Sequence, residues 1–128
     1  VIIMLGTNDI GRGSPAEHIL DFVTSIHEIA HDRGIPTIAV APSTVRQGQP
    51  RTTRNRFAGM LHWWKRWSSY TVSYQDVEDL VPRTVVGNWE SDELHMSPQG
   101  SHQLGLSLSK PVAKAMNSLT SSAKRLFR

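Results

Sequence analysis

The sequence predicts an α/β domain in which helices cover both faces of a mostly parallel sheet, a three-layer α/β/α sandwich. Segments with strand and helix patterns alternate along the chain, and the two clearest strand segments, 1–5 and 37–41, are apolar throughout. Apolar runs of this kind are typical of strands buried on both faces of a parallel sheet. A chain of 128 residues suits one such domain. Ligands of open parallel sheets bind where the strands end.

The first predicted strand is Val1–Leu5, which the polar sequence Gly6-Thr7-Asn8-Asp9 ends. We expect these four residues to form a loop at the carboxyl end of the strand. The chain opens inside this apolar strand, without an initiator Met, a basic leader or a signal-peptide cleavage pattern. We therefore expect the chain to lack its natural start.

The first helix is predicted to begin with Ser14 as N-cap, Pro15 at the first helical position and Glu17 closing a capping box. Gly34 gives the C-terminal stop, and Pro36 prevents the helix from continuing. Apolar residues at helical spacing should face the core: Ile19, Phe22, Val23, Ile26, Ile29 and Ala30.

Two further strands and a second helix follow. Residues 37–41 form the second strand, 46–53 a polar loop, 53–67 a helix and 71–74 a weaker third strand, before an irregular stretch. The helix should bury one apolar side: Phe57, Met60, Leu61 and Trp64.

The last helix begins after Ser97-Pro98, with Ser97 as its N-cap. Its core stripe is Leu104, Leu108, Val112 and Met116. Pro111 predicts a kink or two short helices. We expect the domain to occupy residues 1–120 and the Ser-rich, basic residues 121–128 to form a frayed tail.

Composition excludes several classes of protein. The chain has no cysteine, so it has no disulfides, no thiolate zinc site and no cysteine nucleophile. Its longest apolar run, Val1–Leu5, is far shorter than the ~20 residues of a membrane-spanning helix. The net charge is +3, yet seven Lys or Arg and no acid lie between Arg33 and Gln75. Such a surface is typical of a solvated basic face and could also attract anions.

The sequence His27-Glu28-Ile29-Ala30-His31 matches H-E-x-x-H, the helical zinc motif of metalloproteases. In the longer form of that motif, Thr37 takes the position of the third ligand, and threonine cannot replace histidine there. On a helix, the two histidines lie at the flank of the apolar stripe and Glu28 faces water. We therefore expect three solvated helix residues and no metal site, with a zinc metalloprotease as an alternative.

The sequence His62-Trp63-Trp64-Lys65-Arg66-Trp67 mixes aromatic with basic residues, as platforms for single-stranded nucleic acids do. Trp64 continues the apolar side of its helix and belongs to the predicted core, whereas Trp63 lies off that side. A module that binds nucleic acid or an anionic surface is therefore a further alternative. We do not expect nucleic acid to be the main partner.

A third pattern joins Asn8, after the first strand, to Asp92-Glu93-Leu94-His95, before the last helix. An Asp and a His three residues apart in a loop can place the carboxylate against Nδ1 of the imidazole. That contact leaves Nε2 free to deprotonate a nucleophile. An Asn at a strand end can direct its amide at a developing oxyanion.

This combination resembles the SGNH, or GDSL, hydrolase family of serine esterases and lipases. The family's Gly-x-Asn-Asp block follows its third strand, and its Asp-x-x-His block precedes its last helix. The resemblance covers essentially the whole chain and implies a flavodoxin-like fold that the chain enters at the third strand. It implies that His95 is the general base, Asp92 its orienting partner and Asn8 an oxyanion-hole donor, while Gly6 and Asp9 brace the loop.

The family's nucleophile, the Ser of a Gly-Asp-Ser block, has no counterpart in this chain. Ser14 and Ser97 have predicted N-cap roles, and neither follows Gly-Asp. Ser43, after the second strand, is the one conceivable substitute, and no strand-turn-helix elbow surrounds it.

The resemblance therefore implies the C-terminal part of a serine ester hydrolase that acts on a small-molecule ester, without cofactor and inactive on its own. A non-catalytic binding domain of the same fold is an alternative. In the family's sheet, the first strand lies beside the third. Without it, Val1–Leu5 would be an open apolar edge, through which we expect self-association.

Overall fold

The computed structural model describes residues 1–127. Three strands form one parallel sheet in the order β1-β2-β3. The elements along the chain are β1 (Ile2–Ile3), α1 (Thr7–Gly11), α2 (Ala16–His31), β2 (Thr37–Ala41), α3 (Gln49–Lys65), β3 (Thr71–Asp76), α4 (Val77–Leu80) and α5 (Pro98–Leu126).

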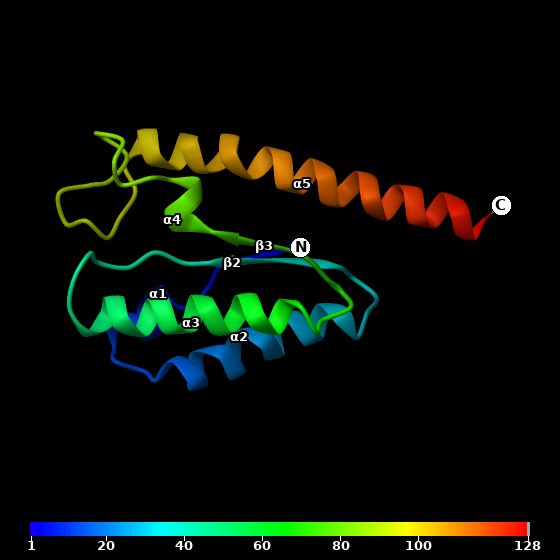
Figure 1. Ribbon diagram of the computed structural model, residues 1–128, viewed down its shortest axis with the longest axis horizontal. Coiled ribbons are helices and arrows are strands. Elements are labelled where there is room, and N and C mark those ends of the chain that lie inside the picture. The colour runs from blue at the N-terminus through cyan, green and yellow to red at the C-terminus, as the bar shows by residue number, and fades with distance from the viewer. Residues whose placement is uncertain (128) are drawn as a thin grey trace.

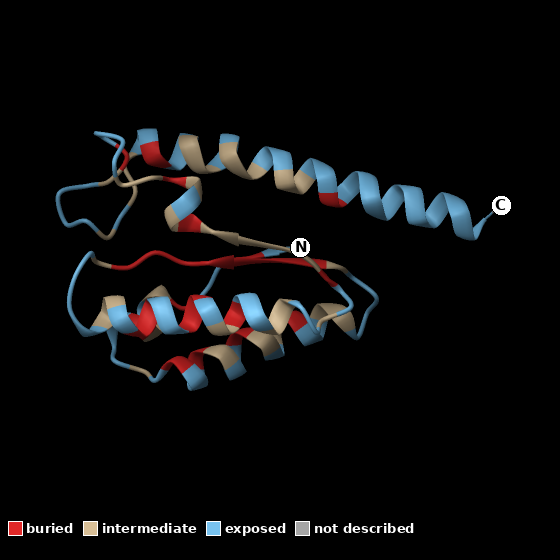
Figure 2. Cartoon of the chain, in the orientation of Figure 1, coloured by how far each residue is buried: buried red, intermediate tan, exposed pale blue. Residues whose placement is uncertain are grey.

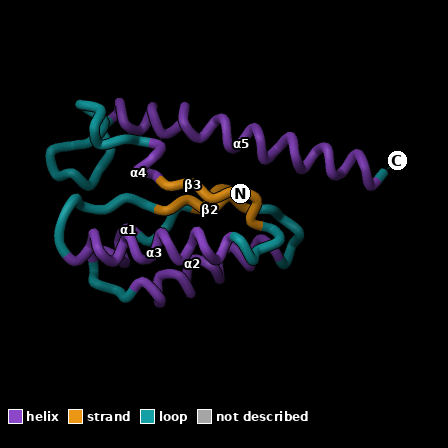
Figure 3. Tube along the Cα trace, viewed as in Figure 1, coloured by secondary structure: helices purple, strands orange, loops and turns teal. Residues whose placement is uncertain are grey.

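The elements form three layers. Helices α2 and α3 lie on one face of the sheet and α5 lies on the other, as Figures 1 and 3 show. The predicted α/β/α arrangement around a parallel sheet is therefore confirmed. Within the part that the structure describes, no helix combines the length and the apolar character needed to cross a bilayer.

Strand β2 lies at the centre of both cores, and its residues are buried throughout (Figure 2). Ala39 faces the α2–α3 side, where Ile19, Phe57 and Leu61 pack. Ile38 and Val40 face the opposite side, where the apolar residues of α5 cover them. Alternate side chains of one fully apolar strand thus fill two cores, as expected for a strand covered on both faces.

Strand β1 is shorter and more exposed than predicted. Only Ile3 is buried, whereas Ile2 is 47% exposed. The prediction of burial on both faces is wrong here because only the face that carries Ile3 is covered. Ile2 is in register with Ile38 and shares its face of the sheet, yet α5 does not bury it.

Helix α2 begins without the predicted capping box. Pro15 is the N-cap and no side chain caps the helix, so the role assigned to Ser14 is wrong. The Ser14 amide donates instead to the Asp9 carbonyl, and Glu17 pairs with Arg56 of α3. Two residues of the predicted core stripe, Phe22 and Ile29, are more than half exposed.

The middle of the chain is more regular than predicted. Helix α3 begins at Gln49, inside the expected loop, because Gly48 adopts φ 85° before it and Pro50 fits its first turn. Strand β3 extends to Asp76, whose side chain then accepts from the Glu78 amide and caps α4.

Helix α5 runs without interruption from Pro98 to Leu126, so the predicted alternative of two short helices around Pro111 is wrong. Leu108 before the proline and Val112 and Ala115 after it pack on the same core. This packing holds both halves of the helix on one face of the sheet. The expected frayed tail is helical as far as Leu126.

Candidate active site

Asp92 and His95 form a tight turn between α4 and α5. The turn closes a short antiparallel bridge in which Trp89 pairs with Met96, and the Glu90 amide donates to the His95 carbonyl at 2.8 Å. One carboxylate oxygen of Asp92 accepts from the amides of Leu94 and His95, at 2.9 and 3.0 Å.

The second carboxylate oxygen of Asp92 lies 2.6 Å from Nδ1 of His95. The hydrogen bond from the His95 ring, followed by those from the two amides, lowers the pKa of Asp92 to about 2. The carboxylate is therefore ionised at neutral pH and favours the His95 tautomer that carries its proton on Nδ1. The His95 side chain is 71% exposed, and its Nε2 makes no hydrogen bond to a described residue.

The predicted Gly6–Asp9 loop is the first turn of α1. Gly6 is its N-cap with φ 116°, and a Cβ there would come within 3.0 Å of Ile19. Thr7 ties α1 to the end of β2 by donating to the Ser43 carbonyl at 3.2 Å. Asn8 is exposed. The backbone carbonyl of Asp9 accepts a hydrogen bond from the Ser14 amide and so links α1 to the start of α2.

A pocket of about 490 Å³ connects α1 to the Asp92–His95 turn. It lies at the carboxyl end of the sheet, where ligands of this fold class bind. Asn8 lines it from α1, and Leu94 lines it from the turn. The remaining lining residues come from α1 and its C-cap, from the segment after β2 and from the first turn of α3: Thr7, Gly11, Arg12, Thr44, Val45 and Pro50.

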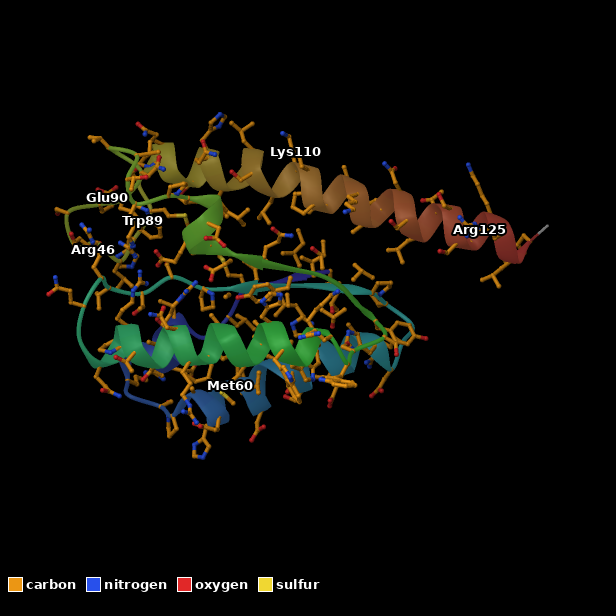
Figure 4. The ribbon with its side chains drawn as sticks, viewed as in Figure 1. Arg46, Met60, Trp89, Glu90, Lys110 and Arg125 are labelled. Carbon is orange, nitrogen blue, oxygen red and sulfur yellow. The ribbon has the colours of Figure 1, made fainter. Side chains whose placement is uncertain are left out.

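Arg83 connects the turn to the rest of the domain, and nothing in the sequence pattern indicates this role. Its guanidinium donates to the Glu93 carbonyl at 2.7 Å and to the Thr44 carbonyl at 2.6 Å. It also pairs with Glu78 at 2.8 Å and lies 4.1 Å from the centre of the Trp89 ring. Figure 4 shows Trp89 near Arg46 and Glu90 at this end of the molecule.

The bond from Arg83 holds a strained residue. Glu93 has φ 56°, the one positive φ among the described non-glycine residues, and such a conformation needs support from its surroundings. Burial alone would raise the pKa of Glu78, but the hydrogen bonds from Arg83 and Arg51 outweigh it and lower the pKa to about 2. Glu78 therefore stays charged and keeps Arg83 in place.

None of the candidate serines is hydrogen-bonded to His95. Within residues 1–127, no hydrogen bond joins His95 to a serine hydroxyl. Ser97 is the N-cap of α5 and accepts from the Gly100 amide at 3.0 Å, as predicted. Ser43 is buried after β2, 8% exposed.

The H-E-x-x-H residues lie at the opposite end of the sheet, and the prediction that they are all solvated is wrong. His27 is fully buried, and its Nδ1 lies 2.7 Å from the Thr37 hydroxyl. Nε2 of His31 lies 2.9 Å from the same hydroxyl. Glu28 is exposed, as expected.

The surroundings of His27 explain its burial. Its ring packs against Trp64, with centroids 5.1 Å apart, and its Nε2 has no hydrogen-bond partner among the described residues. Burial, together with the charge of His31, lowers the pKa of His27 to about 4. Across residues 1–127, no three His, Cys, Asp or Glu side chains are grouped so that they could hold a metal ion.

The aromatic and basic segment His62–Trp67 lies partly in the core and partly on the surface. Trp64 packs against the core, whereas Trp63 and Trp67 are 62% and 73% exposed. The two exposed rings lie 5.8 Å apart.

The fold and the position of its polar residues define an open parallel α/β protein with a candidate site at the carboxyl end of the sheet. The sequence model of the GDSL-like Lipase/Acylhydrolase family matches residues 1–103. The chain therefore belongs to the GDSL-like lipase/acylhydrolase family, and the resemblance to SGNH hydrolases is confirmed. A comparison with curated proteins gave no match. Membership supports an esterase or acylhydrolase type of function.

Proposed function

We propose that this chain carries the general base, its orienting carboxylate and one oxyanion donor of a serine ester hydrolase. The contact of 2.6 Å between Asp92 and Nδ1 of His95 is the observation that carries the proposal. An ionised carboxylate at Nδ1 leaves Nε2 as the proton acceptor, which is the arrangement that a serine nucleophile requires.

The chemistry assigns one role to each group. Nε2 of His95 accepts the proton of the serine hydroxyl as the oxygen attacks the ester carbonyl. The Asn8 amide donates to the oxyanion that forms. The imidazolium then protonates the leaving alcohol, and water hydrolyses the acyl-enzyme with the same help from His95. Asp92 stabilises the imidazolium and remains ionised throughout, because its pKa is about 2.

The nucleophile itself lies outside residues 1–128 in this proposal. Ser43 is not hydrogen-bonded to His95, and Ser97 is engaged in capping α5. Without the serine, the covalent route is closed, so we expect the 128-residue chain alone to be inactive.

Ester hydrolysis tests the assignment. Release of nitrophenol from short acyl nitrophenyl esters is measured for the 128-residue chain and for the protein extended by its native upstream sequence. Only the extended protein should turn over, and His95→Ala should abolish turnover while thermal unfolding stays unchanged. His102→Ala, a histidine on the exposed side of α5, is the matched control. Full activity of the His95→Ala protein would exclude His95 as the base.

The open edge of β1 supports a second proposal, on assembly. Val1, Met4 and Leu5 are each at least 40% exposed beside Ile2, and long apolar edges promote pairing between chains. We expect the 128-residue chain to self-associate through β1 in sedimentation velocity. Ile2→Lys should restore a monomer, and a wild-type chain that sediments as a monomer would contradict the proposal.

A further inference from the structure

Helix α5 is longer than the sheet that it covers. Its last buried residue is Ala115, and the helix continues to Leu126 beyond the end of the sheet (Figures 1 and 2). We call Met116–Phe127 the α5 extension. Every residue of the extension is exposed.

The apolar side of α5 continues along the α5 extension. In the part of α5 that covers the sheet, Leu104, Leu108 and Val112 pack with Ala115 in the core between the helix and the sheet. The same spacing of three and four residues leads on to Leu119, Ala123 and Leu126, so these side chains lie on the same side of the helix. On this stripe Leu119 and Leu126 are 37% and 84% exposed, and beside it Met116 and Phe127 are 60% and 91% exposed. The sheet thus covers the apolar stripe of α5 as far as Ala115, and the stripe is exposed from there to Leu126.

The charged residues in the second half of α5 are all positive, because no acidic residue follows Glu93. Lys110 and Lys124 lie opposite the apolar stripe by helical spacing. Lys114 and Arg125 lie at the flank of the polar side, where Lys114 lines a pocket with residues of β3. Figure 4 shows Lys110 on the side of α5 that faces away from the sheet. A helix with an apolar stripe on one side and Lys and Arg on the other is the pattern of a helix that lies in the interface of a bilayer.

We propose that the α5 extension binds the surface of anionic lipid bilayers. The stripe inserts among the acyl chains, and the cations meet the phosphate and carboxylate groups of the lipid. Two tryptophans strengthen this assignment, because Trp63 and Trp67 are exposed at the C-terminal end of α3, which lies at the same end of the molecule as the extension (Figure 1). Tryptophan prefers the interface between lipid and water.

Two other occupants fit the α5 extension less well. Residues 116–126 form a strip about 16 Å long and about 10 Å wide, whereas a stable dimer buries about 800 Å² on each partner. Nucleic acid would pair with the cations, yet it would leave Leu119 and Leu126 uncovered. An anionic bilayer matches both sides of the helix.

Cosedimentation of the 128-residue chain with vesicles tests the proposal. Vesicles of phosphatidylcholine alone are compared with vesicles that also contain phosphatidylserine. We expect binding to the anionic vesicles, and this binding should weaken as salt increases. Leu119→Gln/Leu126→Gln should weaken it at least about tenfold, because two inserted side chains are lost. Ser118→Gln/Ser121→Gln, on the polar side, is the matched control and should bind as the wild type does.

Two further variants separate the contributions. Lys124→Gln/Arg125→Gln, which removes the two cations of the α5 extension, should weaken binding to anionic vesicles roughly 25-fold, at about fivefold for each cation. Trp63→Ala/Trp67→Ala should weaken it severalfold, and unchanged binding would remove these rings from the bilayer contact. All variants should keep the wild-type unfolding temperature, because the changed side chains are exposed or point into solvent.

Three results would overturn the proposal. The first is no binding, or equal binding to both kinds of vesicle. The second is a lipid-free dimer that Leu119→Gln/Leu126→Gln converts to a monomer, which would assign the stripe to a second copy. The third is binding of a single-stranded oligonucleotide in place of vesicles, with an affinity that the leucine substitutions leave unchanged.

Discussion

His95 at the carboxyl end of the sheet and His27 at the amino end differ in exposure and in hydrogen-bond partner. At the carboxyl end, His95 is exposed and pairs with an ionised carboxylate. At the amino end, His27 is fully buried and pairs with the Thr37 hydroxyl. A free Nε2 beside an aspartate can move protons, whereas a buried, neutral imidazole belongs to the core. Partner and exposure, and not residue type, therefore separate a candidate base from a structural histidine.

The largest predicted effect is at the carboxyl end. In the protein extended upstream, Asp92→Asn should lower kcat for ester hydrolysis by about 10³–10⁴-fold, because the amide no longer selects the productive tautomer of His95. Steady-state kinetics measure this loss, and KM should change little. Asp9→Asn is the matched control and should retain most of the activity. Wild-type kcat in Asp92→Asn would contradict the role of Asp92 in orienting His95.

The next effect is a pH dependence of stability that arises at the amino end. The pKa of His27 in the folded chain is about 4, against an ordinary 6.5, so the unfolded chain binds the extra proton between these values. Stability should therefore fall by about 3 kcal/mol at most as the pH decreases from 6.5 to 4, at up to about 1.4 kcal/mol per pH unit. Urea unfolding at several pH values measures it.

His27→Gln sharpens this prediction, because glutamine can contact Thr37 and does not titrate. The slope between pH 6.5 and 4 should disappear in this variant, while His95→Gln should leave it unchanged. A slope of the same size in His27→Gln would assign the acid sensitivity to another group.

A smaller loss of stability is expected for Arg83→Ala, because Arg83 holds the Asp92–His95 turn against the segment after β2. Loss of the bonds to Glu78, Glu93 and Thr44 should destabilise the domain by about 2 kcal/mol, since Arg51 still pairs with Glu78. The pKa of Glu78, now about 2 against an ordinary 4.5, should rise. Stability from Glu78 is present above pH 4.5 and is lost as the pH falls through 2, so the variant should lose less stability than the wild type between pH 4.5 and 2.

Chemical unfolding of Arg83→Ala and Arg83→Lys measures this effect. Lysine can restore one charged contact and should recover part of the stability. In the extended protein, the alanine variant should also lose kcat, because the turn that holds His95 is released. Unchanged stability and activity would mean that the turn does not depend on Arg83.

The smallest effect concerns two serines that the sequence treats alike. Ser97→Ala should destabilise the chain by about 1 kcal/mol, because its hydroxyl caps α5 beside the Asp92–His95 turn. Ser14→Ala should stay within about 0.5 kcal/mol, because Ser14 caps nothing. Thermal unfolding of the two variants compares them, and equal losses would contradict the difference.

The fold was largely predictable from the sequence because its signals are local. The apolar run of β2 and the alternation of elements are visible without tertiary information, and Thr37–Ala41 is the strand as predicted. The contact between Asp92 and His95 was predictable for the same reason, since the residues are three apart in one turn.

Features that depend on distant parts of the chain were not predictable. Arg83 acts through Thr44, which is 39 residues away, and nothing in the local pattern indicates it. The helical angle of His27, at the flank of the apolar stripe, predicts a solvated residue, but Trp64 and Thr37 enclose it. Pro111 indicated a break, and packing on both sides of the proline kept the helix whole.

Labelling with a fluorophosphonate, which reacts with activated serines, tests the central assignment most directly. The reagent is applied to the 128-residue chain and to the protein extended by its native upstream sequence, and the modified serine is located by mass spectrometry. The predicted result is a label on one serine outside residues 1–128, absent from the 128-residue chain and lost with His95→Ala. A His95-dependent label on Ser43, or a label that survives His95→Ala, would contradict it.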